Sequence, residues 1–492
     1  MNTDNKKINI FTVTDCHQEV RKLCNLFSYI ADNSPKNGKN TLICDCGDLF
    51  KGIYDRDLCV DGYLKLRSLL PEAKIVLAIG NNDFGFNLEN FKFLQKTISV
   101  FNNANINVLC ANLIDVNTEK CPDWVDPYII LDINHKKILV TAFCVNLVRL
   151  QKYGVRLIDI PNAFQQMEKV IKHINPDAFI VLNHALKDSS YNLADMAAKD
   201  GIKIDLLIGG HEHSPIEANE AKHIYYPQAF SKTMLEFELC FGENGALLNF
   251  IGEIYSKGLP INSIFVPQIE EYEKKAGLNI PVAKSTVNLE KIYSDPCSLG
   301  TFIADSMRSE AHTDMAVIST GYTSHALRYE KDKILTNYNL ERAISATVAL
   351  QKMLLRPADI KDIFNNALRN RYIQRSGNVR FLQCSKNVTV VCYKNKDNWG
   401  MVRQIYINGN PLFDENGEPL NPEETFSCAI DPFVAAGEQG FDVLRKIPKE
   451  TLMKNNQIVR IKDVFVKAIK EAPKKYTEGF QYPEFKLIDE SA

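Results

Sequence analysis

Five short polar clusters in the first half of the chain carry side chains that could bind metal ions or move protons. They are Asp15-Cys-His17, Gly47-Asp48, Gly80-Asn81-Asn82-Asp83, Asn183-His184 and Gly209-Gly-His211-Glu-His213. Each cluster follows a short apolar run that is typical of a β-strand, and polar groups at the carboxyl ends of strands in an open α/β sheet face one crevice. The clusters together offer carboxylates, an amide and imidazoles. This mixture suits Zn²⁺, Mn²⁺ or iron and is too rich in nitrogen for Ca²⁺ or Mg²⁺.

No single cluster is specific. A histidine after a strand is usually a hydrogen-bonded structural residue, and the Asp-x-His and Gly-Asp patterns often occur by chance. The order of the five clusters and their shared position after strands favour a metal centre over five unrelated features. We therefore predict that they meet at one site.

The elements that would position these clusters alternate between strands and helices. Strands are expected at 8–13, 41–44, 74–79, 107–109, 137–143, 178–182 and 205–208. Segments 20–32 and 163–173 have apolar residues spaced by three and four, as amphipathic helices do. This alternation predicts an α/β layered fold. A strand-rich stretch, 230–255, follows it.

A second domain is expected after a turn-rich break. We predict a first domain at 1–257, a linker with a connecting helix at 258–286, and a second domain at 287–492. The helix Ser298–Ala311 begins with a serine of the capping type. Strands at 402–407 and 426–430, with the turn Asn408-Gly409, complete a mixed α+β pattern.

The composition excludes several classes of protein and partner. With 492 residues, 45% hydrophobic and 24% charged, the chain is neither disordered nor collagen-like. A net charge of −2 gives no polybasic surface for a nucleic-acid polymer or an anionic membrane. No apolar run approaches the roughly 20 residues of a membrane helix. A chain of this charge can still bind a small phosphate ester at a metal centre, and the sequence does not indicate an oligomeric state.

The cysteines favour a reducing compartment. The chain has 13, an odd number at irregular spacings, and Cys44, Cys110, Cys144 and Cys240 lie in apolar runs where a thiol packs as a small hydrophobe. The N-terminal residues show no signal-peptide pattern. We expect a cytoplasmic protein.

The ordered series of clusters resembles that of the calcineurin-like binuclear metallophosphoesterases. Nearly the whole chain resembles their two-domain 5′-nucleotidase / 2′,3′-cyclic phosphodiesterase branch. The second domain carries this resemblance in Ser298–Arg308, Gln374-Arg-Ser-Gly377, Gly409-Asn-Pro-Leu412, Asp431-Pro-Phe433 and Gly437–Phe441. The resemblance implies an N-terminal four-layer α/β/β/α metallophosphoesterase sandwich and a C-terminal α+β substrate-binding domain.

The resemblance also implies a ligand set for two divalent ions, which we expect to be Zn, Mn or Fe. It puts Asp15, His17 and His213 on one ion and Asn81, His184 and His211 on the other, with Asp48 bridging both. Two adjacent cations acidify a shared water and hold a phosphoryl oxygen, so a metal-bridging hydroxide would attack phosphorus. The implied substrate is a nucleotide or a related phosphate monoester or diester.

The chain departs from the family where a general acid is expected. The family pattern is Gly-Asn-His-[Asp/Glu], and here the His position is Asn82. The Asp that pairs with this His, two residues after Asp83, is Gly85. An amide cannot deliver a proton at neutral pH, but it can donate a hydrogen bond. We expect Asn82 and Asp48 to be the catalytic residues, with Asn82 orienting the phosphate or the leaving oxygen.

The second domain departs from the family too. The loop that normally supplies a substrate-binding arginine is Gly321-Tyr-Thr-Ser-His325. Phe433 corresponds to the aromatic residue that stacks on the base, with Phe381 or Phe441 as the other wall and Gln439 at a nearby acidic position. Ordinary core packing is the alternative for Phe433, because aromatic residues are commonly buried.

Three functions remain open at this point. The first is a metal-dependent phosphoester hydrolase with altered specificity. The second is a catalytically impaired protein that keeps the metals and binds a nucleotide. The third is a hydrolase of a different ester or sulfur group, since the branch includes a thiosulfohydrolase. We expect Cys16 and Cys46 to pack away from the site, because neighbours on an extended strand point to opposite sides.

Overall fold

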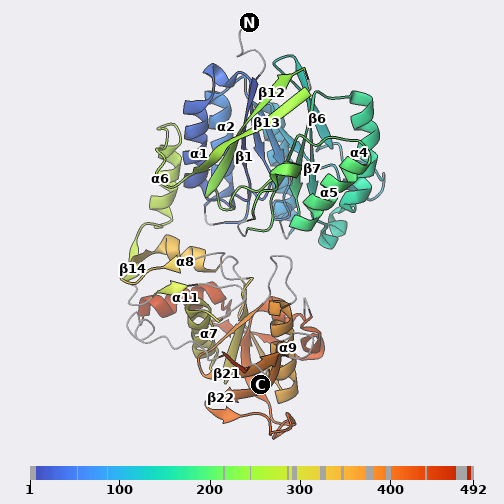
Figure 1. The fold of residues 1–492 in the computed structure, drawn as a ribbon. Coiled ribbons are helices and arrows are strands. Elements are labelled where there is room, and N and C mark those ends of the chain that lie inside the picture. Colours follow the sequence, from blue (N-terminus) through green and yellow to red (C-terminus); the bar gives the residue numbers. More distant parts are fainter. Residues whose placement is uncertain are drawn as a thin grey trace. The chain divides into compact units, whose positions relative to one another are not determined.

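The computed structural model describes most of the chain, in two compact units. The described residues are 7–52, 54–85, 87–213, 216–243, 245–284, 288–290, 296–321, 328–344, 348–372, 381–394, 400–437, 440–471 and 485–488. The units are Met1–Lys275 and Ala276–Ala492 (Figure 1).

Unit 1 contains two large β-sheets. The first has the order β13-β12-β1-β2-β3-β4, and the second β11-β10-β9-β7-β6. The strands of the first sheet are β1 (Lys7–Val13), β2 (Thr41–Asp45), β3 (Lys74–Ala78), β4 (Ile106–Leu109), β12 (Thr233–Gly242) and β13 (Gly245–Tyr255). Those of the second are β6 (Tyr128–Ile133), β7 (Lys136–Cys144), β9 (Ala178–His184), β10 (Leu206–Gly209) and β11 (Ile224–Tyr225). Strands β1 to β4 run parallel, as do β7, β9, β10 and β11.

The two sheets pack face to face and helices cover their outer faces. One apolar core joins residues such as Ile10 and Val76 of the first sheet to Val140 and Ile180 of the second. A separate core packs the outer face of the second sheet against its helices. The helices are α1 (Val20–Asn33), α2 (Arg56–Leu69) and α3 (Leu88–Asn103) on one side and α4 (Ile160–Ile174) and α5 (Lys187–Lys199) on the other (Figure 1). The predicted α/β/β/α sandwich is confirmed.

The helix expected in the linker, α6 (Val266–Lys275), packs on unit 1. Its Glu273 accepts two hydrogen bonds from the Arg21 guanidinium, at 2.8 Å each, and one from the Tyr54 hydroxyl at 2.5 Å. The chain divides after Lys275, inside the predicted linker 258–286. The outer limits of that linker stay a prediction.

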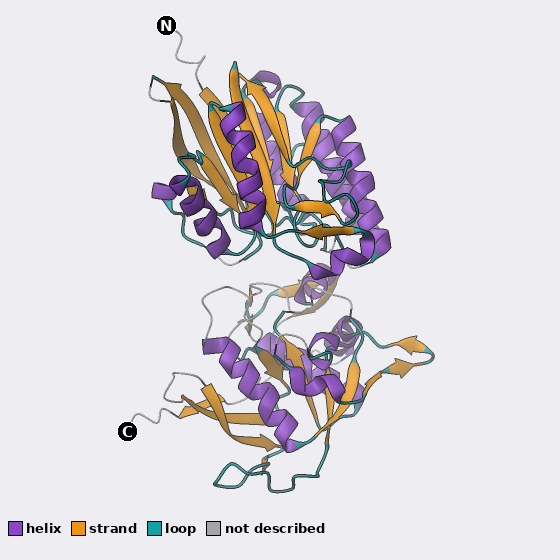
Figure 2. Cartoon of the chain, turned by 90° about the vertical axis from the view of Figure 1, so that its right-hand side faces the viewer, coloured by secondary structure: helices purple, strands orange, loops and turns teal. Residues whose placement is uncertain are grey.

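Unit 2 is a mixed α+β domain (Figure 2). Its larger sheet has the order β20-β16-β24-β19-β25 and its second sheet β23-β22-β21-β28. The strands are β16 (Met315–Ser319), β19 (Gln351–Leu355), β20 (Leu382–Cys384), β24 (Phe426–Ile430), β25 (Lys449–Thr451), β21 (Val388–Lys394), β22 (Gly400–Ile407), β23 (Asn410–Pro411) and β28 (Phe485–Ile488). The helices are α7 (Ser298–Ala311), α8 (Asn337–Ala343), α9 (Pro357–Tyr372), α10 (Pro432–Ala435) and α11 (Ile461–Glu471).

Alternate residues of the larger sheet enter two cores. Val317 and Ile430 lie in one, whereas Ile318 and Ala429 lie in the other with α7 and α11. Short strand pairs complete the two units: β5 (Leu113–Asp115) with β8 (Val155–Leu157), β14 (Pro281–Lys284) with β18 (Ile334–Thr336), β15 (Leu289–Glu290) with β17 (Arg328–Tyr329), and β26 (Met453–Lys454) with β27 (Gln457–Ile458).

Two local predictions for unit 2 have different outcomes. Asn408 and Gly409 have φ of 53° and 81° between β22 and β23, as a two-residue hairpin turn requires, so the predicted turn is confirmed. The predicted cap is wrong: the N-cap of α7 is Cys297, which has no side-chain cap. The Ser298 hydroxyl donates instead to the Asn288 carbonyl at 3.1 Å.

The cysteines are mostly core residues. All thirteen lie in the described part of the chain, and none of them is in a disulfide. Cys44, Cys110 and Cys144 are buried as predicted, whereas Cys240 is only partly buried. Among the described residues, no helix is long and apolar enough to span a bilayer.

Candidate metal centre

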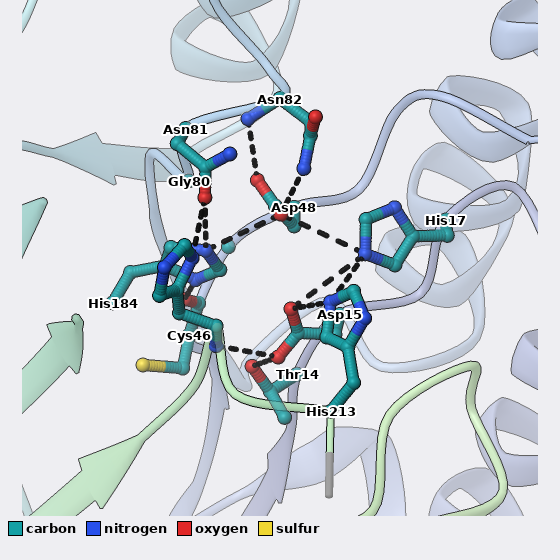
Figure 3. Close-up of polar contacts among 12 residues, drawn as sticks. Thr14, Asp15, His17, Cys46, Asp48, Gly80, Asn81, Asn82, His184 and His213 are labelled. Atoms are coloured by element: carbon teal, nitrogen blue, oxygen red, sulfur yellow. Dashed lines mark hydrogen bonds and ion pairs between the residues drawn. The ribbon is translucent and has the colours of Figure 1, made fainter. Parts of the chain in front are cut away.

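All seven predicted metal ligands come together in unit 1. They lie just beyond, or at the end of, β1, β2, β3, β9 and β10, whose carboxyl ends share one edge of the sandwich (Figure 3). Because these strands are parallel within each sheet, residues far apart in the sequence meet there. The sequence prediction of a single meeting point is therefore matched by the fold.

A first group of ligand atoms comes from Asp15, His17, Asp48 and His213. Their candidate donor atoms all lie within 4.8 Å of one another. The Nε2 atom of His213 is 2.9 Å from Asp15 Oδ1 and 2.8 Å from His17 Nε2. The His17 Nε2 atom is 3.6 Å from Asp48 Oδ2.

A second group adjoins it and uses the same oxygen of Asp48. His184 Nε2 lies 3.3 Å from Asp48 Oδ2 and 3.2 Å from Asn81 Oδ1. His211 Nδ1 lies 2.7 Å from the same Asn81 oxygen. Figure 3 shows the Asp48 carboxylate between the two groups.

This arrangement fits two adjoining cations. Ligand atoms around a tetrahedral zinc ion, at bonds of about 2.0–2.1 Å, are separated by about 3.3 Å. The separations above, from 2.7 to 3.6 Å, lie around that value. The atoms that face one another are mostly carboxylate or amide oxygens and imidazole nitrogens, which are metal ligands. The division of the seven residues between two ions stays a prediction.

The backbone of five of the seven ligands is in the left-handed region. The φ values are 48° for Asp15, 47° for His17, 59° for Asp48, 82° for His211 and 27° for His213. Residues other than glycine rarely adopt such values, and they persist where the surroundings enforce them, often at functional sites. Five of the seven candidate ligands therefore share a conformation that residues other than glycine rarely adopt.

Two glycines allow the loops to approach closely. A Cβ atom on Gly80 would lie 2.2 Å from the Asp48 nitrogen. One on Gly210 would lie 2.4 Å from Thr14 Oγ1 and 2.9 Å from His184 Nδ1. Only glycine permits this packing without a shift of the ligands.

Asp83 holds two of the ligand loops together. Its buried carboxylate accepts hydrogen bonds from the backbone N–H groups of Gly80 at 2.8 Å, Asp48 at 2.9 Å and Phe50 at 3.0 Å. Asp83 stands in one of the five polar clusters of the sequence, but this structural role was not predicted. The signal that could have indicated this role is the acidic residue at the end of the Gly-Asn-x-[Asp/Glu] pattern.

Other contacts fix the orientation of individual ligands. The Thr14 hydroxyl and the His211 backbone N–H donate to Asp15 Oδ2 at 2.7 and 3.0 Å. His184 Nδ1 lies 2.7 Å from the Cys46 carbonyl oxygen, which leaves its Nε2 facing Asp48.

The electrostatics of the site favour cations. Burial would raise the pKa of Asp15 and of Asp48, but the neighbouring histidines outweigh it and hold both pKa values below the usual range. Burial would lower the pKa of His184, yet the charges of Asp48 and Asp15 raise it to about 10. The pKa of His211 is lowered to about 4 by burial and by His184. Two buried anions thus draw positive charge to this place.

Asn82 lies directly against Asp48. Its backbone N–H donates to Asp48 Oδ1 at 2.7 Å and its side-chain amide donates to Asp48 Oδ2 at 2.6 Å. The amide therefore contacts the carboxylate shared by both ligand groups.

The two cysteines beside the ligands are buried, but the reason given for Cys16 is wrong. Its neighbours Asp15 and His17 have positive φ, so the segment is not extended and the alternation of an extended strand does not apply. The Cys46 thiol donates to the Ile208 carbonyl at 3.2 Å.

The aromatic residues of unit 2 that were predicted to bind substrate lie in or against its apolar core. Phe381 and Phe441 are fully buried in its core, and Phe433 is partly buried against the same core. In this conformation the first two rings pack internally and present no face to a ligand. Gln439 and positions 322–325 of the loop that lacks an arginine fall outside the described residues.

Comparison with known families agrees with this architecture. Residues 8–215 match the calcineurin-like phosphoesterase model, and residues 279–446 match the 5′-nucleotidase C-terminal domain model.

Similar proteins and structures span most of the chain. An apyrase from Aedes aegypti is 21% identical over 94% of this chain and 87% of its own length. An apyrase from Tabanus yao is 25% identical over 83% of this chain and 79% of its own. The crystal structure of a 5′-nucleotidase precursor from Thermus thermophilus has a TM-score of 0.73 at 16% identity, covering 98% of this chain and 99% of that one. A sulfate thiohydrolase from the same organism has a TM-score of 0.70 at 14% identity, covering 95% and 83%.

At these identities the solved structures show the shared fold, and the two family models account for both units. The chain belongs to the calcineurin-like phosphoesterases that carry a 5′-nucleotidase C-terminal domain.

Proposed function

We propose that this protein is a phosphoester hydrolase that depends on two divalent metal ions and acts on a small nucleotide-like phosphate ester or anhydride. The observation that carries the proposal is the convergence of six candidate ligand side chains on the two sides of a seventh, the Asp48 carboxylate. The names of its relatives, apyrase and 5′-nucleotidase, support a nucleotide as the substrate class. The ions are of the Zn, Mn or Fe type.

Bound cations at this place would supply Lewis-acid catalysis and acidify a water molecule. The chain's own residues prepare the site for that chemistry. Asp15 and Asp48 stay ionised because the histidines lower their pKa values. His211, with its lowered pKa, keeps a nitrogen lone pair available as a ligand. Asn82 holds Asp48 with two hydrogen bonds and presents an amide beside it.

The leaving group must do without the family's general acid. Asn82 and Gly85 replace the histidine and its partner aspartate. General acid catalysis is worth about 10²–10⁴-fold in rate. The protein should therefore favour esters whose leaving group is stable as an anion, and alkyl monoesters should react slowly.

The same replacements raise a second candidate, a protein that binds a nucleotide and metals without efficient turnover. One panel of substrates separates the two. We expect metal-loaded protein to hydrolyse bis-p-nitrophenyl phosphate, p-nitrophenyl phosphate or a nucleoside polyphosphate faster than a nucleoside monophosphate. Absence of hydrolysis across this panel and 2′,3′-cyclic nucleotides would reject the hydrolase. Calorimetric binding of a nucleotide under those conditions would then support the second candidate.

We also propose a reducing compartment for the protein. Eleven of the thirteen cysteines are buried and none is in a disulfide. Buried thiols of this kind are usual where the surroundings keep cysteine reduced.

A further inference from the structure

A small pocket in unit 1 lies beside the candidate metal centre. Its volume is about 170 Å³, and its walls include Asn82, Gly85, Arg56, Phe50 and Phe93. At roughly 30 Å³ per liquid water, it has room for a group of about five heavy atoms, such as one phosphoryl group. Two of its walls are the positions where the chain lacks the family's general acid and partner aspartate. We call this space the Arg56 pocket.

Arg56 is held in place at the start of α2. Its guanidinium carbon lies 3.8 Å from the centroid of the Phe93 ring, and its Nη1 donates to Asn90 Oδ1 at 2.9 Å. Phe93 is itself fixed by an edge-to-face contact with Phe50, with the ring centroids 5.3 Å apart. A stacked, hydrogen-bonded guanidinium is a preorganised cation.

The charge of Arg56 is not strongly neutralised. The carboxylate nearest to it, that of Glu89, is 3.5 Å from Nη2 but its side chain is 81% exposed, so water screens the pair. Lys51 also lines the pocket and adds positive charge. The Asp83 carboxylate at the pocket wall already accepts hydrogen bonds from three backbone N–H groups. The pocket is thus suited to a negatively charged group.

No side chain can replace Gly85 without a change of conformation. Its φ is 65°, and a Cβ atom there would lie 2.2 Å from Asn90 Cβ. The Asn82 amide is engaged with Asp48. The space beside the metal centre is therefore left open, and Arg56 supplies a fixed cation to it.

We propose that Arg56 is a specificity-determining residue, whose guanidinium binds the departing oxygen group of the substrate in this pocket. The inference rests on the proposed function. In the reaction, the bond between phosphorus and the leaving oxygen breaks and its electron pair stays on that oxygen. A water oxygen forms the new bond to phosphorus, and its proton passes to solvent. Arg56 stabilises the developing negative charge and transfers no proton. The favoured ligands are leaving groups that are stable anions, such as a phosphate of an anhydride or a phenolate.

The test is the dependence of rate on leaving-group acidity. Wild type, Arg56→Gln and Arg56→Lys, all metal-loaded, are assayed on aryl phosphate esters whose phenols span several pKa units. The matched control is Arg156→Gln, which removes a partly exposed arginine paired with Glu119 on the same unit. Metal content and melting temperature are measured for each variant.

We expect the rate of Arg56→Gln to depend more steeply on the pKa of the leaving phenol, because the negative charge on the leaving oxygen is no longer compensated. Its kcat/KM should fall by about 100-fold for the least acidic phenol and by less for the most acidic. Arg56→Lys should lie between it and wild type, and the control should match wild type. Metal content should be equal throughout.

Two other results are distinguishable. If wild type is active and Arg56→Gln keeps its slope, or loses activity equally on every ester, Arg56 has no role at the leaving group and the inference is wrong. If wild type hydrolyses none of the series, the proposed function fails and this inference fails with it.

Discussion

At the scale of single residues, Asn82 and Gly85 decide how this site differs from its family. Asn82 has become a partner of Asp48, through both its backbone and its side chain. Gly85 sits in a left-handed conformation with Asn90 against it, so the aspartate that would orient a histidine has no place. The two changes act together, because an imidazole without its partner is poorly oriented.

We therefore predict that Asn82→His does not restore general acid catalysis. Its kcat/KM on an alkyl phosphate should stay within about 3-fold of wild type, well short of the 10²–10⁴-fold that an oriented acid gives. Adding Gly85→Asp should lower stability by about 1–3 kcal/mol through backbone strain and crowding. Steady-state kinetics and urea denaturation measure both effects. A gain of 100-fold or more for the single variant would contradict this interpretation.

At the scale of elements, the loops after β2 and β3 depend on one carboxylate. Asp83 accepts three backbone hydrogen bonds that join them and so fixes Asp48 relative to Asn81. Asp83→Ala would leave these buried N–H groups without that acceptor, at about 1–3 kcal/mol for each unsatisfied group.

We predict that Asp83→Ala lowers the free energy of unfolding by about 3 kcal/mol or more and weakens metal binding, while Asp83→Asn, which keeps one acceptor oxygen, loses less. Urea denaturation and metal titration measure the two effects. Asp115→Ala is the control. The Asp115 carboxylate likewise accepts hydrogen bonds from backbone N–H groups, two in number, but it does so in an exposed turn. Equal losses for Asp83→Ala and the control would refute this role.

The elements also show which features a sequence reveals. Strand β24 and helix α7 match their predicted bounds, because each has a clear apolar period and a clear end. The predicted cap of α7 is wrong because the serine pattern does not show that the Ser298 hydroxyl donates to the Asn288 carbonyl. The positive φ values of the ligand residues were not predicted, since Asp and His are enriched at positive φ but mostly adopt other conformations, so the residue type alone does not identify such positions. Phe381 was predicted as a binding residue because an aromatic ring is equally apolar in a core or against a base.

At the scale of the whole molecule, the candidate metal ligands belong to one of two units with separate cores. The seven ligands lie in unit 1, whose cores are distinct from those of unit 2. A ligand that binds only the folded state stabilises the unit that binds it.

We predict two thermal unfolding transitions in calorimetry. When EDTA removes the metals, the midpoint temperature of only one of them should fall. The shift corresponds to about 4 kcal/mol if the metal is present at 1,000 times its dissociation constant. The second transition should not move. In Asp48→Asn, EDTA should shift neither transition by a comparable amount. If EDTA leaves both transitions of wild type unchanged, folding is not linked to a bound metal.

The central claim is that Asp48 joins two metal sites, and elemental analysis of purified protein tests it most directly. After loading with Zn²⁺ or Mn²⁺ and removal of excess metal, wild type should hold about two ions per chain. Asp48→Asn should hold one or none, and Asp195→Asn, a control at an exposed carboxylate, should hold two. A wild-type value near zero, or an unchanged value of two in Asp48→Asn, would contradict the account.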